Sequence, residues 1–169
     1  MRTSFDKAFE IVIGLEGKPS DDPADPGGLT VWGLSKRYNP EVSLTMTIDE
    51  AKAIYLKRYW MPSGCDTLPF PMDVCVFDAR VNPQDDPDLP GGSMQELMNQ
   101  SPENWQEYLI LRMQRYMKRS KEKYVKGHVF RILRLHKQIK ALNKWYNDPQ
   151  IAYQSITTSA TVGNIDNGH

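Results

Sequence analysis

Two segments rich in proline, glycine and aspartate constrain the fold of this 169-residue chain more than any other feature of its sequence. They cover residues 18–33 and 82–92, and their composition favours neither a continued helix nor a continued strand. Outside them, apolar residues recur three or four positions apart, which is the helical period, and no series of strands follows from the pattern. The sequence therefore predicts a mainly α fold with at most a short β-hairpin near residues 29–33.

The predicted helices have recognisable start and stop signals. The clearest is the capping box Thr47-Ile-Asp-Glu50, which opens a helix that runs through Tyr59 and is closed by Pro62. Ser4 is placed to cap a first helix that ends near Glu16. The other helices are expected over residues 71–82, 93–98, 101–116 and about 129–145.

Length and composition indicate one globular domain. With 40% hydrophobic and 25% charged residues, the chain does not belong to the collagen-like, fully disordered or disulfide-scaffold classes. We expect the domain to span residues 1–147, because residues 148–169 are rich in Ser, Thr, Gly and Asn and are expected to form a flexible tail. Cys65 and Cys75 are expected to be reduced thiols, and the cysteines and three scattered histidines have no zinc spacing, so no metal site is expected.

The chain carries no pattern typical of a membrane span or an export signal. No run of about eighteen apolar residues is present. Near the N-terminus, Asp6, Lys7 and Glu10 interrupt the apolar residues where a Sec signal would have an unbroken hydrophobic region. We therefore expect a protein that is made in the cytoplasm without a Sec signal.

The formal net charge is zero, but the charges are unevenly distributed. Residues 112–144 hold 12 basic residues and one acidic residue, whereas residues 1–111 hold 9 basic and 18 acidic ones. The basic segment either packs against the acidic part and neutralises it, or it binds an anionic partner. Nucleic acid is not the expected partner, because its binding needs exposed aromatic rings among the basic residues, and Tyr116, Tyr124 and Phe130 are expected to face inward.

One segment carries residues suited to acid–base chemistry. Glu16 follows the apolar Leu15 at the end of a predicted helix, where partial loss of water raises the pKa of a carboxyl group. Asp25 lies in a polar loop and should stay ionised. Glycoside hydrolysis needs two such carboxyl groups, one to protonate the leaving oxygen and one to activate water or stabilise positive charge on the sugar. Thr30 can hold a water, and Gly28 allows the backbone to approach a ligand closely.

Each of these residues also has a structural interpretation. Asp-rich turns cap helices and Gly-Gly pairs make turns, whereas a calcium loop is disfavoured because the EF-hand spacing is missing. Trp32 either stacks on a sugar or packs in the core, and Asn82 either binds an N-acetyl group or caps its helix. Asp78 is either a second carboxylate of the site or a buried partner for an arginine, and His136 is expected to lie in the core.

An ordered series of motifs begins with LEG at residues 15–17 and DPGGLTVWGLS at residues 25–35. These two motifs are similar to the E-G-G and D-P-G-G-x-T signature of the glycoside hydrolase family 108 N-acetylmuramidases, which the chain resembles. Further similar motifs lie in residues 50–60, 76–82, 93–97, 112–116 and 127–135. Lys18-Pro19 and Asn82-Pro83 depart from the family pattern, which bears on affinity and substrate range more than on the reaction.

The resemblance implies an α-helical lysozyme-like fold that cleaves the β-1,4 bond between N-acetylmuramic acid and N-acetylglucosamine without a cofactor. It implies that Glu16 is the general acid. The spacing of Glu16, Asp25 and Thr30 is similar to the Glu-Asp-Thr triad of phage-type lysozymes, one residue short before the threonine. The candidate substrate contacts are Gly28, Trp32 and Asn82.

The expected partner is the glycan strand of peptidoglycan, and the expected role is host lysis by a monomeric phage endolysin. Such a protein is made in the bacterial cytoplasm and acts in the periplasm or cell wall, which it reaches through a holin or another export route. Two other functions stay open at this point. One is a non-catalytic wall-binding or virion structural module on the same scaffold, and the other is a lytic transglycosylase, which uses one glutamate but no water.

Overall fold

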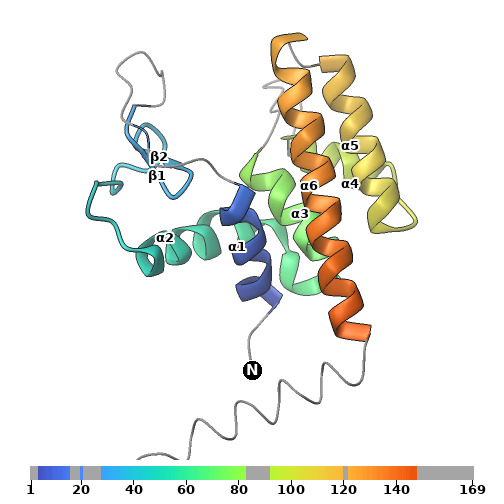
Figure 1. Cartoon of the computed structure of the whole chain (residues 1–169), viewed down its shortest axis with the longest axis horizontal. Coiled ribbons are helices and arrows are strands. Elements are labelled where there is room, and N and C mark those ends of the chain that lie inside the picture. The colour runs from blue at the N-terminus through green and yellow to red at the C-terminus, as the bar shows by residue number, and fades with distance from the viewer. Residues whose placement is uncertain (1–3, 16–19, 21–27, 83–91, 120–121, 148–169) are drawn as a thin grey trace, which may run out of the picture.

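The computed structural model describes residues 4–15, 20, 28–82, 92–119 and 122–147. Most of this part is helical, and one two-stranded antiparallel sheet accompanies the helices (Figure 1). The elements are α1 (Ser4–Leu15), β1 (Thr30–Val31), β2 (Leu34–Ser35), α2 (Ile48–Tyr55), a π-helical turn (Leu56–Trp60), 3-10 turns (Met61–Ser63 and Cys65–Thr67), α3 (Met72–Val81), α4 (Gly92–Asn99), α5 (Trp105–Arg119) and α6 (Glu122–Asn147). The prediction of a mainly α fold is confirmed, whereas the predicted tail at 148–169 lies outside the described residues.

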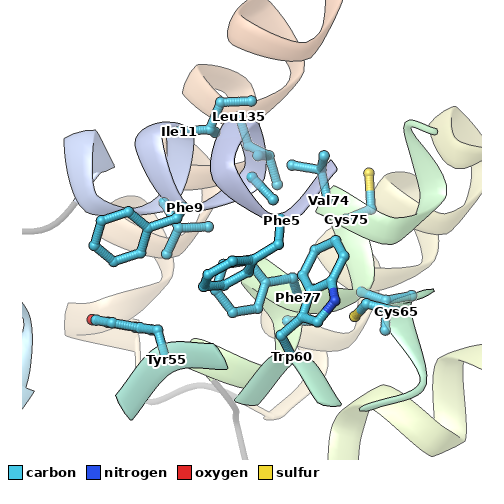
Figure 2. Close-up of a cluster of buried hydrophobic side chains, with 14 of the residues drawn as sticks. Phe5, Phe9, Ile11, Tyr55, Trp60, Cys65, Val74, Cys75, Phe77 and Leu135 are labelled. Atoms are coloured by element: carbon cyan, nitrogen blue, oxygen red, sulfur yellow. The ribbon is translucent and has the colours of Figure 1, made fainter. Parts of the chain in front are cut away.

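The core forms where α1 packs against α3 and the π-helical turn. The Phe5 ring lies 5.4 Å from Trp60 and 5.9 Å from Phe77, and both contacts are edge-on (Figure 2). Aromatic pairs of this kind contribute about 0.5–1.5 kcal/mol each beyond the burial of their area. Ser4 is the first residue of α1 rather than the residue before it, and its hydroxyl donates to the carboxyl group of Asp73 in α3. The side chain expected to cap α1 therefore links α1 to α3.

The capping box at the start of α2 is confirmed. The Glu50 amide donates to the Thr47 hydroxyl (3.2 Å), and the Thr47 amide donates to the Glu50 carboxylate (2.7 Å). The α-helix ends at Tyr55, however, and continues as a π-helical turn to Trp60, which the sequence did not predict. Five residues in an α-helix span about 500°, so a regular helix would place Tyr55 and Trp60 on different faces. The wider turn brings both buried rings to the core.

The predicted hairpin is present and reaches two residues further than expected. Thr30 pairs with Ser35 and Val31 with Leu34, and Ser20 forms an isolated bridge to Thr30. Trp32 (φ 53°) and Gly33 (φ 76°) occupy the two turn positions, and both have the positive φ that a type I′ hairpin turn requires. The chain reverses directly at Trp32 for this reason.

The C-terminal helices α5 and α6 pack against each other (Figure 1). The sequence placed the start of the last helix near Val129, but α6 begins at Glu122 and continues through Gly127. The His128 ring stacks on the Tyr116 ring of α5, with 4.4 Å between ring centroids and 22° between ring planes. This contact anchors the early turns of α6 on α5 and explains why the helix tolerates an internal glycine.

The prediction that the aromatic rings of the basic segment face inward is wrong for two of the three rings. Tyr116 is buried, but Tyr124 and Phe130 are half exposed. The expectation that nucleic acid is not a partner loses this premise and stays a prediction. Three arginines of the segment meet acidic groups of the N-terminal part, because Arg112 and Arg131 pair with Asp78, and Arg115 pairs with Glu96. Packing against the acidic part therefore neutralises some of the basic charge.

Cys65 and Cys75 are free thiols, as predicted, and both are buried. Burial, together with the nearby charges of Asp73 and Asp66, raises the pKa of the Cys65 thiol to about 12, so this thiol stays protonated at neutral pH. Within the described ranges, no helix combines the length and the apolar character that crossing a bilayer requires.

Candidate functional site

A cavity of about 350 Å³ lies where the C-terminal ends of α1 and α3 meet α6. Leu15 is the last residue of α1, and Asn82 caps the end of α3. Figure 1 shows α1 lying beside α3 and α6, consistent with the contacts between these helices. The described residues that line the cavity are Leu15, Asn82, Gly127, Phe130, Arg131 and Arg134.

Beside this cavity, a buried carboxylate of α3 pairs with arginines of α5 and α6. Asp78 of α3 is fully buried and pairs with Arg112 of α5 (Nη1 to Oδ2, 2.5 Å) and with Arg131 of α6 (Nη2 to Oδ1, 2.7 Å). Arg131 Nε also donates to Asp78 Oδ1 at 3.1 Å, so this pair is bidentate. Asp78 is therefore a buried structural partner of two arginines, which decides between the two interpretations that the sequence left open.

Electrostatics fix the charge states in this network. Burial raises the pKa of Asp78, but the charges of Arg112 and Arg131 lower it more, and the net pKa lies below the ordinary value for an aspartate. Asp78 is thus ionised at neutral pH. Removing one partner of a buried ion pair typically costs about 3–5 kcal/mol, because the other charge remains buried without compensation.

Asn82 is held at the cavity through its backbone. Its carbonyl oxygen accepts hydrogen bonds from Arg112 Nη2 (3.3 Å) and from the Tyr116 hydroxyl (3.2 Å). Its amide donates to the Asp78 carbonyl (3.0 Å), which completes the end of α3. Asn82 therefore caps its helix, as one of the two predicted roles requires, and it also lines the cavity.

Gly127 and Phe130 form an apolar part of the wall, although the sequence analysis named neither of them as a substrate contact and expected Phe130 to face inward. A Cβ atom added at Gly127 would meet nothing within 4 Å, so the protein leaves open the space beside this residue. Glycine inside a helix is less stable than alanine by about 1 kcal/mol. Phe130 lies three residues further along the same helix face and is half exposed. The signal that could have identified this wall is the series Gly127, Phe130, Arg131 and Arg134, which have the spacing of one helix face.

The predicted residues Gly28, Thr30 and Trp32 lie together in the hairpin. Gly28 has φ 65° and no atom within 4 Å of its would-be Cβ, so the predicted backbone freedom is used there. Thr30 Oγ1 donates to the Gly28 carbonyl (3.3 Å), which leaves its oxygen able to accept from a water. Trp32 is partly buried, and its indole N–H donates to the Met46 carbonyl (2.9 Å).

The other predicted residues lie in different places. Glu16 and Asp25 are outside the described residues. Asn82 is at the cavity, and within the described part of the chain no hairpin residue lines that cavity. His136 stacks on Trp105 (centroids 5.2 Å apart, 30° between planes) and is half-buried, as expected for a histidine that packs against the core. Within the same described part, no three potential ligands gather as a metal site.

A second hollow, of about 460 Å³, lies at the opposite end of α1. Phe5, Asp6 and Lys52 line it, and the Lys52 ammonium pairs with the Asp6 carboxylate at 2.5 Å. Ten residues of helix separate Phe5 from Leu15, so the two hollows are roughly 15 Å apart. The second hollow is therefore a separate feature of the surface.

Comparisons with known proteins give a family and a fold. A family model described as glycosyl hydrolase 108 matches residues 9–83, a range that includes Leu15 and Asn82. A solved structure entitled "Structure of Brucella abortus SagA" has a TM-score of 0.58 and 23% sequence identity, and the match covers 87% of this chain and 98% of that chain. No curated protein matches the chain. The structural likeness shows a shared fold, and the family match supports a glycoside hydrolase of the general lysozyme type that acts on peptidoglycan.

Proposed function

Because residues 9–83 of this chain belong to the glycosyl hydrolase 108 family, we propose that it is an N-acetylmuramidase that cleaves the β-1,4 bond between N-acetylmuramic acid and N-acetylglucosamine. Glu16 is the proposed general acid. The single observation that carries this assignment is the position of the cavity. Leu15 lines the cavity, and Glu16 directly follows Leu15 in the sequence.

The cavity has the features that a glycan subsite needs. Phe130 offers a half-exposed ring, which can pack against the apolar face of a sugar, and Asn82 offers an amide for the N-acetyl group. The open space beside Gly127 allows a ligand to approach the helix backbone. These contacts support a glycan as the ligand.

In the proposed reaction, the Glu16 carboxyl group protonates the leaving glycosidic oxygen. The Asp25 carboxylate activates or orients the attacking water, or stabilises the positive charge that develops on the sugar. Thr30 holds the water, since its hydroxyl hydrogen is directed to the Gly28 carbonyl and its oxygen is left as an acceptor. The protein needs no cofactor for this chemistry.

The test compares wild type with Glu16→Gln on purified peptidoglycan and identifies the ends of the released products. Glutamine has the shape of glutamate but cannot donate a carboxyl proton, so the rate should fall by about 10²-fold or more while the fold persists. We expect reducing N-acetylmuramic acid ends from wild type. Circular dichroism of both proteins controls for unfolding.

Each other outcome identifies a different function. Products with 1,6-anhydromuramic ends would indicate a lytic transglycosylase. Binding to peptidoglycan without any cleavage would indicate a wall-binding or virion structural module. Equal cleavage by wild type and Glu16→Gln would remove Glu16 from the catalytic role.

The biological role that we propose is host lysis by a phage endolysin. Its support is the resemblance to lysozyme-type wall hydrolases alone. Co-expression with a holin in a bacterial host tests this role, because an endolysin of this kind lyses the culture after the holin opens the membrane. Lysis that does not depend on the holin would point to another export route.

A further inference from the structure

We propose that the cavity between α1, α3 and α6 binds a carboxylate carried by a substituent of the glycan, with Arg134 as the cationic contact. The enzyme would then select acidic peptidoglycan over neutral glycans of the same backbone. This inference rests on the proposed function and specifies the substrate of the same site.

The charge of the cavity wall is the first argument. Arg131 and Arg134 line the cavity, and none of the described residues that line it is acidic. Behind the wall, the single carboxylate of Asp78 faces two guanidinium groups, those of Arg112 and Arg131. These three groups leave one positive charge, and Arg134 adds a second. The described wall therefore favours an anionic ligand.

Arg134 is the residue able to contact that ligand. Arg131 is only 12% exposed, and its Nε and Nη2 both donate to Asp78. Arg134 is exposed and lies three residues further along α6, on the same face of the helix. In the part of the chain that the structure describes, no carboxylate pairs with Arg134. A guanidinium group binds a carboxylate through two parallel hydrogen bonds, which fixes orientation as well as charge.

The helix presents the other cavity residues in line with Arg134. Gly127, Phe130, Arg131 and Arg134 are at positions i, i+3, i+4 and i+7, which form one stripe along α6. Gly127 leaves space at one end of the stripe, and Phe130 provides an apolar surface before the charged end. This order of open space, apolar ring and guanidinium group matches a sugar ring that carries an acidic substituent.

The pKa of His128, which is next to Gly127 in α6, indicates the sign of the local electrostatic potential. Burial lowers the pKa of His128, and the charges of Arg112 and Arg131 lower it further, so the imidazole is neutral at pH 7. The same positive potential that disfavours a proton on His128 favours an anion in the adjacent cavity.

Peptidoglycan offers this carboxylate from two sources. One is the set of carboxylates on the stem peptides, and the other is the lactyl carboxylate of N-acetylmuramic acid, which is free once the stem peptide is removed. The test therefore uses three substrates: native peptidoglycan, the same material with its carboxylates converted to neutral amides by a carbodiimide, and glycan strands stripped of their stems by an amidase.

The variants are Arg134→Gln, Arg134→Lys and Lys137→Gln. Lys137 is exposed on α6 and does not line the cavity, so Lys137→Gln removes the same charge from the same helix as a matched control. On native peptidoglycan, Arg134→Gln should raise KM about tenfold or more with kcat nearly unchanged, because the variant loses the charge-assisted hydrogen bonds to the carboxylate. Arg134→Lys should recover part of this loss, and Lys137→Gln should behave as wild type.

On amidated peptidoglycan, wild type and Arg134→Gln should have the same raised KM. A difference between the two proteins on the stripped strands would show that Arg134 also binds the lactyl carboxylate, and no difference would show that it binds a carboxylate of the stem peptide. An equal KM of wild type for native and amidated material, or an equal effect of Arg134→Gln on both, would overturn the inference while the hydrolase function stands.

A binding measurement separates the two proposals completely. Sedimentation with insoluble native or amidated peptidoglycan is measured for Glu16→Gln and for Glu16→Gln with Arg134→Gln, in which the substrate is not consumed. We expect the native wall to retain about tenfold less of the protein that lacks Arg134. This readout decides the inference even if wild type cleaves nothing, in which case only the hydrolase proposal fails.

Discussion

The two sides of α3 are stabilised by different kinds of contact. On the side of Phe5, the contacts are aromatic rings packed edge to face with Trp60 and Phe77. On the side of α5 and α6, a buried carboxylate joins two arginines from separate helices. Loss of one aromatic pair should lower the free energy of unfolding only slightly, because each pair contributes little by itself. The second kind acts as a unit, and the cavity proposed to bind glycan lies against it.

The largest effect is expected from Asp78→Ala, which tests whether the network acts as a unit. The change leaves Arg112, which is only 2% exposed, without its carboxylate partner. We expect the free energy of unfolding to fall by about 3–5 kcal/mol. Urea denaturation followed by circular dichroism measures it. A loss below about 1 kcal/mol would mean that water compensates the arginines and that the network is not a unit.

The acid dependence of stability should differ between the two sides. Because the folded pKa of Asp78 lies below its unfolded value, its contribution is present above the unfolded pKa, near 3.9, and is lost as the pH falls through the folded pKa. For Asp73, burial raises the folded pKa despite the bonds from Ser4 and Val74, so its protonation favours the folded state as the pH falls. Urea denaturation across acidic pH should therefore show opposite changes in pH slope for Asp78→Asn and Asp73→Asn. Equal slopes would contradict the assigned charge states.

Phe77→Leu is the corresponding change on the aromatic side. It removes a ring that contacts Phe5, Tyr55 and Trp60, but it keeps an apolar side chain of similar volume. The expected loss is about 1–2 kcal/mol, smaller than that of Asp78→Ala although the two positions are adjacent in α3. Urea denaturation under the same conditions gives the comparison. A loss as large as that of Asp78→Ala would remove the distinction between the two sides.

The smallest effect is expected from Gly127→Ala, which should increase stability and weaken binding to peptidoglycan. Gly127→Ala should raise the free energy of unfolding by up to about 1 kcal/mol, since a Cβ meets no protein atom there and alanine favours the helix. It should weaken retention by peptidoglycan, because the methyl group takes the space proposed for the ligand. The matched control is Ala141→Gly, at an exposed position of the same helix, which should lower stability without changing retention. Unchanged retention by Gly127→Ala would argue against a ligand at this wall.

The sequence predicted the apolar contacts around Phe5 and Phe77 better than the ion pairs of Asp78. Apolar periodicity identifies a buried face within one helix, and this was enough for α1, α2 and α3. The Asp78 pairs join residues 34 and 53 positions apart, and no local pattern states which arginine meets which carboxylate. The π-helical turn after Tyr55 was missed because it depends on where Trp60 packs in the assembled core.

The candidate site was predicted in pieces. Motif resemblance predicted Glu16 as the general acid, and the glycine-rich segment predicted a short hairpin near residues 29–33. The wall of α6 was not predicted, because the sequence analysis started that helix near Val129 and so left Gly127 out of it. Phe130 was expected to face inward because apolar residues usually do, but it lies in the wall of an open cavity and is half exposed.

The central claim is that the glycan binds in the cavity at the C-terminal end of α1. The most direct test is to titrate 15N-labelled Glu16→Gln with a soluble disaccharide–peptide fragment of peptidoglycan and to follow the backbone amide resonances. The account predicts that the largest shifts fall on Leu15, Asn82, Gly127 and Phe130. Shifts concentrated at Phe5, Lys52 and Leu56, around the hollow at the other end of α1, would contradict it.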